Sequence, residues 1–487
     1  MATDNEPAPE PPGRRRTRLL VFIVLALILV VAGFVFVSQI SDRPVDYAQI
    51  TDHFKYGSIG SEPANGIPYW IWKVLPEMFP EKLPGKGYAS IGFLEEPGRD
   101  TPIGFSQRTV FINRVGLNCG VCHTGTYRES ATSQPIIVIG MPANKLDLQR
   151  YIDFLTDCAR DSRFSPSYMM PAIEAIGGKL NPIEKFIYRY IAIYQTRDAL
   201  LRQGEQLALL RQHRWGAGRV DTFNPYKALK FDFPMDKLPP DELVGAADLP
   251  SIWNQGPREG MNLHWDGNNS SVQERNKSAA LGAGVTPTTI DLARIKRIEE
   301  WLLNLQPPAY PFPINPALAA KGETIYQQNC ASCHAFSGKT VGQVVPIDEI
   351  GTDRHRLDSY TYELLSNQNT LYAGYPWRFQ HFRKTNGYAN QPLDGIWLRA
   401  PYLHNGSVPT LRDLLEPVEK RPRKFYRGDD LFDQQKVGFV SEVPEENGVS
   451  YFEYDTSLPG NSNTGHYYGT DLSPDEKEAL VEYLKKL

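Results

Sequence analysis

The chain has 487 residues, a formal net charge of −4 and a pI near 6.2. Its length leaves room for two or three domains with their own cores, and its slightly acidic balance excludes nucleic acid as an expected partner. The 39 prolines and 39 glycines predict long loops between the regular elements.

The N-terminal end of the chain predicts a membrane anchor. Residues 1–18 are rich in Pro and Glu and end in an arginine cluster, so we expect a disordered, basic, cytoplasmic tail. Residues 19–38 form an apolar run, and about nineteen helical residues at roughly 1.5 Å each span one bilayer core. The alternative is a cleaved signal peptide, but no small-residue cleavage site follows the run. The sequence therefore predicts a single-pass anchor in the bacterial inner membrane, with the rest of the chain in the periplasm.

Four of the five cysteines lie in two motifs of the form Cys-x-x-Cys-His. Their residues are Cys119, Cys122 and His123 in the first copy, and Cys330, Cys333 and His334 in the second. This spacing lets two thiols bond the vinyl groups of one haem while the histidine reaches its iron, so we expect two covalently bound c-type haems. The alternatives are a zinc site and a redox dithiol. The fifth cysteine, Cys158, is expected to be a small buried hydrophobe.

The first domain, expected over 41–306, contains three stretches with helical apolar spacing. They are residues 145–159, 182–210 and 290–305. The aromatic-rich stretch 69–79 is expected to pack against a large flat group or, alternatively, in an ordinary core. Between 215 and 285 the periodicity fails, which indicates a long irregular segment whose 263–269 loop carries function.

A run of prolines over 307–318 is expected to form a stiff linker to a second domain at 319–487. A short helix over 319–328 would present the second motif, and a capping box at Ser473 would start the final helix, 474–487. Each domain then starts from a haem motif and closes with an amphipathic helix. The sequence predicts a mainly α fold of two cytochrome c-like haem domains with long loops and insertions, plus one N-terminal transmembrane helix.

The second ligand of each iron decides whether a haem only passes electrons or also meets a substrate. No methionine follows the second motif, so unless the first domain reaches across, the second iron is expected to bind two histidines or to keep a free position. The four candidates are His355, His381, His404 and His466. We expect His466, which lies in a loop just before the final helix, and we keep His404 as the alternative.

The first haem lacks an obvious second ligand. After His123 the next histidines are His213 and His264, far along the chain. If neither reaches the iron, that haem keeps a free position for H2O2 or O2 and is the catalytic one. His264 remains an alternative as a ligand or as an acid/base group.

The motif LDGIWLRAPYLHNGSVPTL at 393–411, together with two haem motifs in separate domains, resembles the bacterial di-haem cytochrome c peroxidase superfamily, which includes MauG-like proteins. The stretches 68–72, 263–269 and 465–469 resemble most closely its RoxA-like rubber oxygenase branch. This resemblance implies that the C-terminal haem transfers electrons and that Trp265 bridges the two haems. It also implies a bridging calcium ion, to which we assign no ligands.

From these features we expect an oxidoreductase in which the haem of His123 reacts with H2O2 or O2. A redox donor protein or a quinol-linked cytochrome would supply electrons, and His264 or Glu274 would move protons beside the free iron position. Two other hypotheses stay open: a dioxygenase that cleaves an apolar alkene, and a membrane-tethered electron carrier without a substrate.

Overall fold

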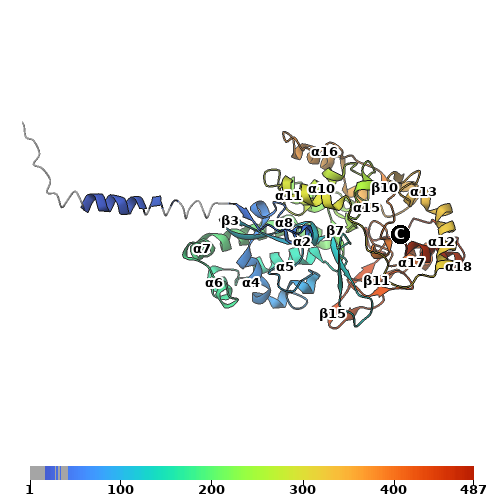
Figure 1. Cartoon of the computed structure of the whole chain (residues 1–487), viewed down its shortest axis with the longest axis horizontal. Helices are drawn as coiled ribbons and strands as arrows, with labels where there is room; N and C mark the ends of the chain where they lie inside the picture. Colours follow the sequence, from blue (N-terminus) through green and yellow to red (C-terminus); the bar gives the residue numbers. More distant parts are fainter. Residues whose placement is uncertain (1–16, 28, 31–32, 34–41) are drawn as a thin grey trace, which may run out of the picture.

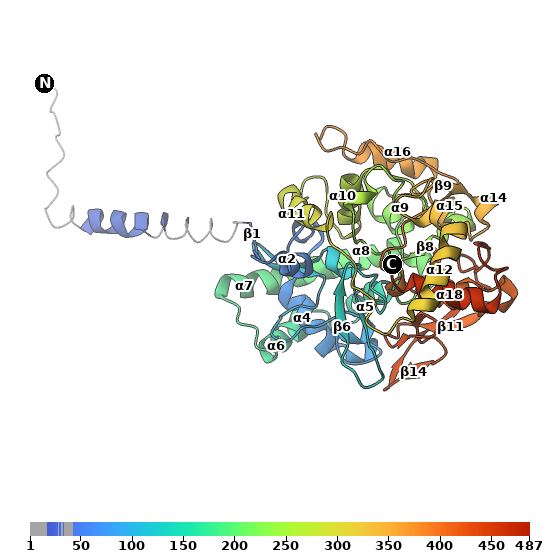
Figure 2. The ribbon, with the colours of Figure 1, turned by 45° about the vertical axis from the view of Figure 1, so that its right-hand side comes forward.

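The structure is a computed structural model that describes residues 17–27, 29–30, 33 and 42–487. Helices account for 42% of the residues and strands for 12%, which confirms the expectation of a mainly α fold. Residues 42–487 form one body in which elements from the two halves of the chain lie against each other (Figures 1 and 2).

The predicted anchor, 19–38, lies partly outside the described residues. Residues 17–27 are helical, and so are 29, 30 and 33. Among the residues that the structure describes, no helix is both long and apolar enough to cross a membrane. Of the predicted basic tail, only Thr17 and Arg18 are described, so the tail and the anchor stay predictions.

The first half of the chain surrounds a four-stranded antiparallel sheet with helices. The strand order is β1-β3-β4-β2, and β3 and β4 form a hairpin. The strands of this half are β1 (Arg43–Pro44), β2 (Ile67–Pro68), β3 (Phe105–Val110), β4 (Ile112–Leu117), β5 (Thr124–Tyr127), β6 (Ile136–Ile139), β7 (Arg219–Asp221) and β8 (Ala246–Asp248). The helices are α2 (Ile50–Tyr56), α3 (Glu62–Asn65), α4 (Tyr69–Met78), α5 (Leu148–Arg160), α6 (Pro166–Ala175), α7 (Pro182–Ile187), a π-helix (Tyr188–Ala192), α8 (Ile193–Gln206), α9 (Asn224–Lys230), α10 (Val272–Gly282) and α11 (Leu292–Leu302).

The aromatic stretch 69–79 forms α4 and the turn after it, and most of its side chains enter the core of the first half. Trp72 stacks on Tyr88 with 4.6 Å between ring centres, and its Nε1 donates to the hydroxyl of Tyr151 at 3.2 Å. No residue of 69–79 lines the large cavity described below, so this stretch packs in an ordinary core, which is the alternative given above. Cys158 is buried in the same core, as predicted.

The second half places its first and last helices side by side. Its helices are α12 (Pro316–Asn329), α13 (Ala331–His334), α14 (Ile347–Ile350), α15 (His355–Ser359), α16 (Tyr362–Leu371), α17 (Leu411–Leu414) and α18 (Pro474–Leu484). Its strands are β9 (Val344–Pro346), β10 (Gly387–Ala389), β11 (Lys424–Arg427), β12 (Phe432–Asp433), β13 (Gly438–Phe439), β14 (Glu445–Glu446), β15 (Val449–Ser450) and β16 (Phe452–Asp455), paired β9 with β10, β11 with β16, β12 with β13 and β14 with β15. A Cβ on Gly322 would lie 1.9 Å from the Ala479 oxygen, so glycine permits the close crossing of α12 and α18.

The two halves share part of their core. Trp253 of the first half lies in one cluster with Trp397 and Phe432 of the second half. The Pro-rich connector also packs on this cluster, since the Tyr310 ring lies 5.4 Å from that of Trp397. The connector therefore holds the halves together rather than acting as a free spacer, and it ends where α12 begins at Pro316, before the predicted 318.

The segment 215–285 is less irregular than predicted, because α9 and α10 lie within it. Ser271 is the N-cap residue of α10, because its hydroxyl accepts the N–H of Glu274 at 3.3 Å. The helix was missed since it is polar and lacks an apolar stripe. The predicted helices 145–159, 182–210 and 290–305 are present with shifted ends, and residues 188–192 of the second are π-helical.

Candidate haem sites

The first Cys-x-x-Cys-His motif forms a turn between β4 and β5. Asn118 fixes this turn, because its Oδ1 accepts the N–H of Gly120 at 2.9 Å and its Nδ2 donates to the Gly57 oxygen at 3.0 Å. At the end of the turn, His123 Nδ1 lies 2.9 Å from the Pro250 oxygen. In the tautomer that donates this bond, Nε2 is left free. Histidines that bind metals are commonly oriented in this way, so His123 is preset to bind iron through Nε2.

A cavity of about 1000 Å³ adjoins this motif, at the upper end of the range for cofactor sites. Both cysteines of the motif and His123 line it. Apolar side chains from the sheet and from α5 and α8 form much of the remaining wall, among them Phe105, Val115, Leu117, Leu148, Leu155 and Leu200. The cavity therefore offers an apolar chamber beside two thiols and an oriented imidazole.

Arg275 of α10 adds a positive charge to the wall of this cavity. Its side chain is only 9% exposed, and among the described residues no hydrogen bond or ion pair holds its guanidinium. Burial, and then the charge of Arg258, lowers its pKa to about 10. A buried cation without a counter-ion is costly, and a haem propionate would supply the missing anion. The residues present thus fit a haem.

The alternatives to haem fit this geometry less well. Burial raises the pKa of the Cys119 and Cys122 thiols to about 12, whereas a reactive dithiol has a lowered pKa. Within residues 42–487 and the described helical residues before them, no three Cys, His, Asp or Glu side chains form a metal-binding group. Burial, with Arg275 next in effect, lowers the pKa of His123 to about 3 and keeps the imidazole neutral, as a ligand must be.

Two of the three predicted catalytic residues line the cavity. His264 Nδ1 lies 2.7 Å from Asn268 Oδ1, and burial with the nearby Arg275 lowers the pKa of His264 to about 4. Trp265 Nε1 donates to the Asp248 oxygen at 2.8 Å. The 263–269 loop that carries both residues is closed by a backbone bond of 2.6 Å from the N–H of residue 263 to the oxygen of residue 269.

The third predicted catalytic residue, Glu274, does not line the cavity. Its carboxylate accepts the backbone N–H groups of Gln380 and His381 at 2.7 and 3.0 Å, and it also contacts His381 Nδ1 at 2.8 Å. Asn269 Nδ2 donates to the same carboxylate at 3.1 Å. With its lone pairs engaged, Glu274 ties the start of α10 to the 380–381 loop, and the proton-shuttle role expected for it is not supported.

Glu299 of α11 is a cavity carboxyl that sequence reasoning missed. It lines the chamber, its Oε1 has no hydrogen-bond partner, and burial raises its pKa to about 7. Its charge also affects the pKa of Cys119, which places it near the first motif. A carboxyl with a pKa near neutrality in a haem cavity suits proton transfer. In the sequence Glu299 cannot be told apart from its neighbour Glu300, which is exposed, so only the fold shows that Glu299 faces the cavity.

Replacing Glu299 with glutamine is expected to stabilise the protein at high pH only. The folded-state pKa of about 7 exceeds the ordinary 4.5, so the wild type loses stability as pH rises between these values and keeps the full loss above about 7. At high pH the free energy of unfolding of the variant should exceed that of the wild type by about 1–3 kcal/mol. This is less than the pKa shift alone implies, because water reaches part of the side chain.

Urea unfolding at low and high pH measures this difference in the free energy of unfolding. The exposed control Glu300→Gln should show no such pH dependence, and an equal effect of Glu299→Gln at both pH values would contradict the assignment.

The second motif lies at the end of α12 and in α13. His334 Nδ1 lies 2.8 Å from the Gln391 oxygen, which repeats the arrangement of His123. Opposite it stands His466, with 6.2 Å between the two ring centres. A metal held between two imidazole nitrogens at roughly 2 Å each separates the ring centres by about 6 Å. This pair therefore fits a haem iron with two histidine ligands.

Arg421 holds the loop that carries His466. Its guanidinium donates to the backbone oxygens of Asn463, Gly465 and His466 at 2.6, 2.9 and 3.2 Å. The His466 N–H donates to the Ile350 oxygen at 2.9 Å. Burial lowers the pKa of His466 to about 3, with a further contribution from His334, so the ring stays neutral. The loop is thus built to present a neutral imidazole at a fixed position.

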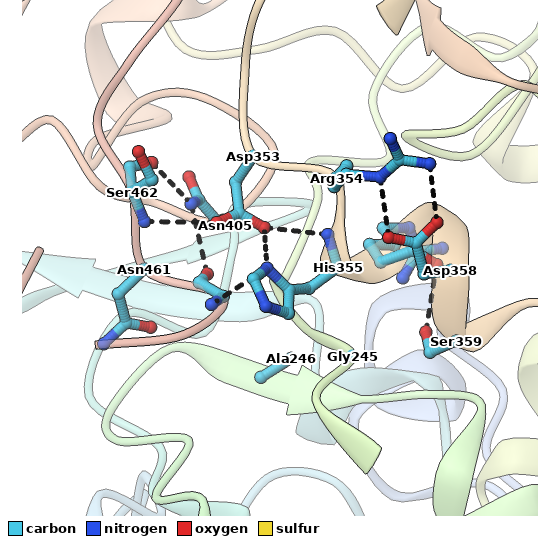
Figure 3. A network of polar contacts seen from close by, with 12 residues as sticks. Gly245, Ala246, Asp353, Arg354, His355, Asp358, Ser359, Asn405, Asn461 and Ser462 are labelled. Atoms are coloured by element: carbon cyan, nitrogen blue, oxygen red, sulfur yellow. Dashed lines mark hydrogen bonds and ion pairs between the residues drawn. The ribbon is translucent and has the colours of Figure 1, made fainter. Parts of the chain in front are cut away.

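A polar network holds Ser462, which precedes this loop in the chain (Figure 3). Asp353 accepts the N–H of His355 and contacts its Nδ1, both at 2.9 Å, and also accepts the N–H of Ser462 at 3.3 Å. Asn405 Nδ2 donates to the Ser462 oxygen at 2.9 Å. In this network His355 binds Asp353, whereas the ring that pairs with His334 belongs to His466.

Three other histidines, His404, His381 and His213, are not paired with either motif histidine. His404, the alternative ligand, stacks on Tyr388 with 3.9 Å between ring centres and is buried. His381 is held by Glu274. His213 does not line the cavity, and burial lowers its pKa. The structure therefore brings His466, and not His404, to His334.

The second half of the chain matches known cytochrome families. Residues 319–395 match the cytochrome c family, and residues 387–427 match a family described as RoxA-like, cytochrome c-like. These matches imply a covalently bound c-type haem with iron.

Two relatives from Sinorhizobium fredii (strain NBRC 101917 / NGR234) are similar over longer stretches. Uncharacterized protein y4iM is 34% identical over 293 residues, which cover 51% of this chain and 66% of the relative, slightly less than two thirds of its length. Uncharacterized protein y4iJ is 25% identical over 504 residues, which cover 82% of this chain and 81% of the relative. Together with the family matches, the geometry supports a haem-containing redox protein whose second half is similar to cytochrome c and, over residues 387–427, to the RoxA-like family.

Proposed function

We propose that the chain is a membrane-anchored, periplasmic di-haem oxidoreductase of the di-haem cytochrome c peroxidase superfamily. Cys119, Cys122 and His123 would hold a haem that reacts with H2O2 or O2. Cys330, Cys333, His334 and His466 would hold a second haem that transfers electrons. When bound, the first haem would supply an iron at which H2O2 or O2 can bind. The residues around it would orient the oxidant and transfer protons to it.

The observation that carries this proposal is the difference between the two motif histidines. His334 faces a second imidazole at 6.2 Å between ring centres, whereas among the described residues no second imidazole approaches His123 in this way. His264 lines the same cavity, but within the described residues no ring contact pairs it with His123 as His466 is paired with His334. One iron would thus be saturated by protein ligands and the other would keep a position for a small oxidant.

The cavity supplies groups that such chemistry needs. Glu299, with its raised pKa, and His264, with its lowered pKa, would exchange protons with the bound oxidant. Arg275 would balance the charge of a haem propionate. The apolar wall would limit the access of water.

Trp265 lies between the cavity and the second half. Its side chain lines the cavity and packs on the cluster that contains Ile350 and Tyr388. Ile350 accepts the N–H of His466. A tryptophan at this place supports the proposed electron path between the two haems.

Replacing Trp265 with phenylalanine is expected to slow the transfer of electrons between the haems by at least about tenfold, a barrier increase of roughly 1.4 kcal/mol. Stopped-flow absorbance after addition of H2O2 to the half-reduced protein measures this rate. Trp301→Phe is the matched control, because Trp301 packs on Phe54 with 5.5 Å between ring centres and does not line the cavity. Equal rates in both variants would contradict the path through Trp265.

Peroxidase activity tests the proposed function directly. Full-length protein, given a reduced c-type cytochrome or a quinol-linked donor and H2O2, should oxidise the donor in proportion to the peroxide consumed. Periplasmic exposure is tested by protease access to the haem domains in spheroplasts. If peroxide leaves the donor reduced, the peroxidase proposal is wrong.

A second candidate function is a RoxA-like dioxygenase that cleaves an apolar alkene. The apolar wall and the size of the cavity favour it. Such an enzyme would consume O2 together with the alkene and need no external electrons. Oxygen uptake that depends on an added alkene but not on a donor would select this function over the peroxidase.

A further inference from the structure

The outer face of the helix that runs from α7 into α8 carries an apolar ridge. We define the ridge as Tyr168 of α6 with Ile183, Phe186, Tyr190, Ile191 and Tyr194. Phe186, Tyr190 and Tyr194 are 58%, 60% and 52% exposed, and Phe186 packs on Tyr190 with 5.0 Å between ring centres. Residues 183, 186, 190 and 194 follow each other at helical spacing, so these exposed side chains form a row along one face of the helix.

The core of the protein does not explain this ridge. The opposite face of the same helix is already buried, through Tyr188, Ala192 and Leu200. The Tyr188 hydroxyl accepts the Trp70 N–H at 3.3 Å. An exposed aromatic patch on a helix that is already packed marks an interaction surface.

Basic residues accompany the ridge. Lys179, Lys185 and Arg189 are exposed next to its apolar members, and Lys185 also pairs with Glu174 of α6 at 3.0 Å. Tyrosine and phenylalanine mixed with lysine and arginine are typical of protein surfaces that rest in the headgroup region of an anionic bilayer.

The ridge lies at the end of the body where the chain enters it. Both views place α7 at the same end as β1, the first strand after the apolar run 19–38 (Figures 1 and 2). β1 pairs with β3, and the turn between β3 and β4 exposes another aromatic residue, Phe111. Arg114 of β4 lies near Tyr188, so the hairpin and the helix are neighbours.

We propose that this ridge docks onto the outer surface of the bilayer that holds the N-terminal anchor, with its aromatic rings at the headgroup boundary. The proposal rests on the membrane anchoring in the proposed function. It also sets the orientation of the first haem site, because Gln195, Asp198 and Arg202 of α8 line the exposed end of the cavity. Asp198 is one helical turn, roughly 6 Å, beyond Tyr194. The cavity would open beside the lipid headgroups.

The test uses the full-length, haem-loaded chain in vesicles of phosphatidylethanolamine and phosphatidylglycerol. Ile183→Cys carries a thiol-linked fluorophore at the edge of the ridge and keeps its aromatic rings, while Tyr362→Cys is a control on α16, where Tyr362 is 73% exposed. The native free thiol, Cys158, is fully buried. Vesicle flotation reports the anchor, and quenching by lipids with a nitroxide near the headgroup reports the ridge.

The expected result is flotation with at least about twofold quenching at position 183 and none at position 362. Lys185→Glu combined with Arg189→Glu should reduce the quenching at 183 without affecting flotation. Flotation without quenching at 183 overturns the ridge proposal and leaves the anchor standing. Failure to float overturns both. Protection of the 183 probe from aqueous quencher without lipid quenching, in particles of two chains, would show that a second copy covers the ridge and would also overturn the proposal.

Discussion

Replacing His466 with alanine is expected to convert the second haem from a low-spin to a high-spin iron and to lower the peroxidase rate by about 100-fold or more, roughly 2.7 kcal/mol. The reason is that His466 is the ring that faces His334 at 6.2 Å between centres. Loss of one strong nitrogen ligand changes the spin state and the reduction potential of the iron, so electrons no longer reach the first haem at the same potential. Absorbance and EPR spectra with redox titration measure the change.

The matched control is His404→Gln. His404 is the other histidine expected as a ligand, but its ring stacks on Tyr388 at 3.9 Å. The control should therefore keep the low-spin spectrum of the second haem, even if it lowers stability. A spectrum that changes in His404→Gln and not in His466→Ala would reverse the ligand assignment.

Removing either cysteine pair is expected to leave one covalent haem per chain in place of two. Cys119→Ala with Cys122→Ala should abolish the reaction with H2O2 and retain the low-spin haem. Cys330→Ala with Cys333→Ala should remove the low-spin haem and stop electron delivery, because each pair supplies the thioether bonds of its own haem. Intact mass and the haem content per chain measure the loss.

Cys158→Ala is the control for both double variants. Cys158 is fully buried on α5, outside both motifs, so its loss should leave two haems. An unchanged haem content in either double variant would contradict the assignment of that motif to a haem.

Local sequence patterns predicted the parts of the sites that depend on short spacing. The Cys-x-x-Cys-His motifs show which residues can reach one haem, and the structure orients both motif histidines through Nδ1. The absence of methionine after the second motif left histidine as its partner. The capping box at Ser473 correctly marked the start of α18, just after the loop of His466.

Features set by tertiary contacts could not be predicted. Glu274 and Arg275 are neighbours in sequence, yet one binds the 380–381 loop and the other lines the cavity. Glu299 gains its raised pKa from burial by segments distant in sequence, which a local pattern cannot show. The polar helix α10 was missed because packing, and not an apolar stripe, holds it in place.

The aromatic residues were the least predictable group. Trp72 packs in the core of the first half, Trp265 lies between the two halves, and Tyr190 is exposed on the surface. Composition shows that aromatic residues are abundant, but only the direction of each side chain separates these three uses.

The EPR spectrum of the oxidised, full-length protein before and after addition of H2O2 shows whether the haem at His123 keeps a free iron position. We expect one low-spin haem with two histidine ligands, unchanged by peroxide, and one high-spin haem whose signal peroxide alters. Two low-spin haems that peroxide leaves unchanged in both oxidation states would contradict the free position at His123 and leave only an electron carrier.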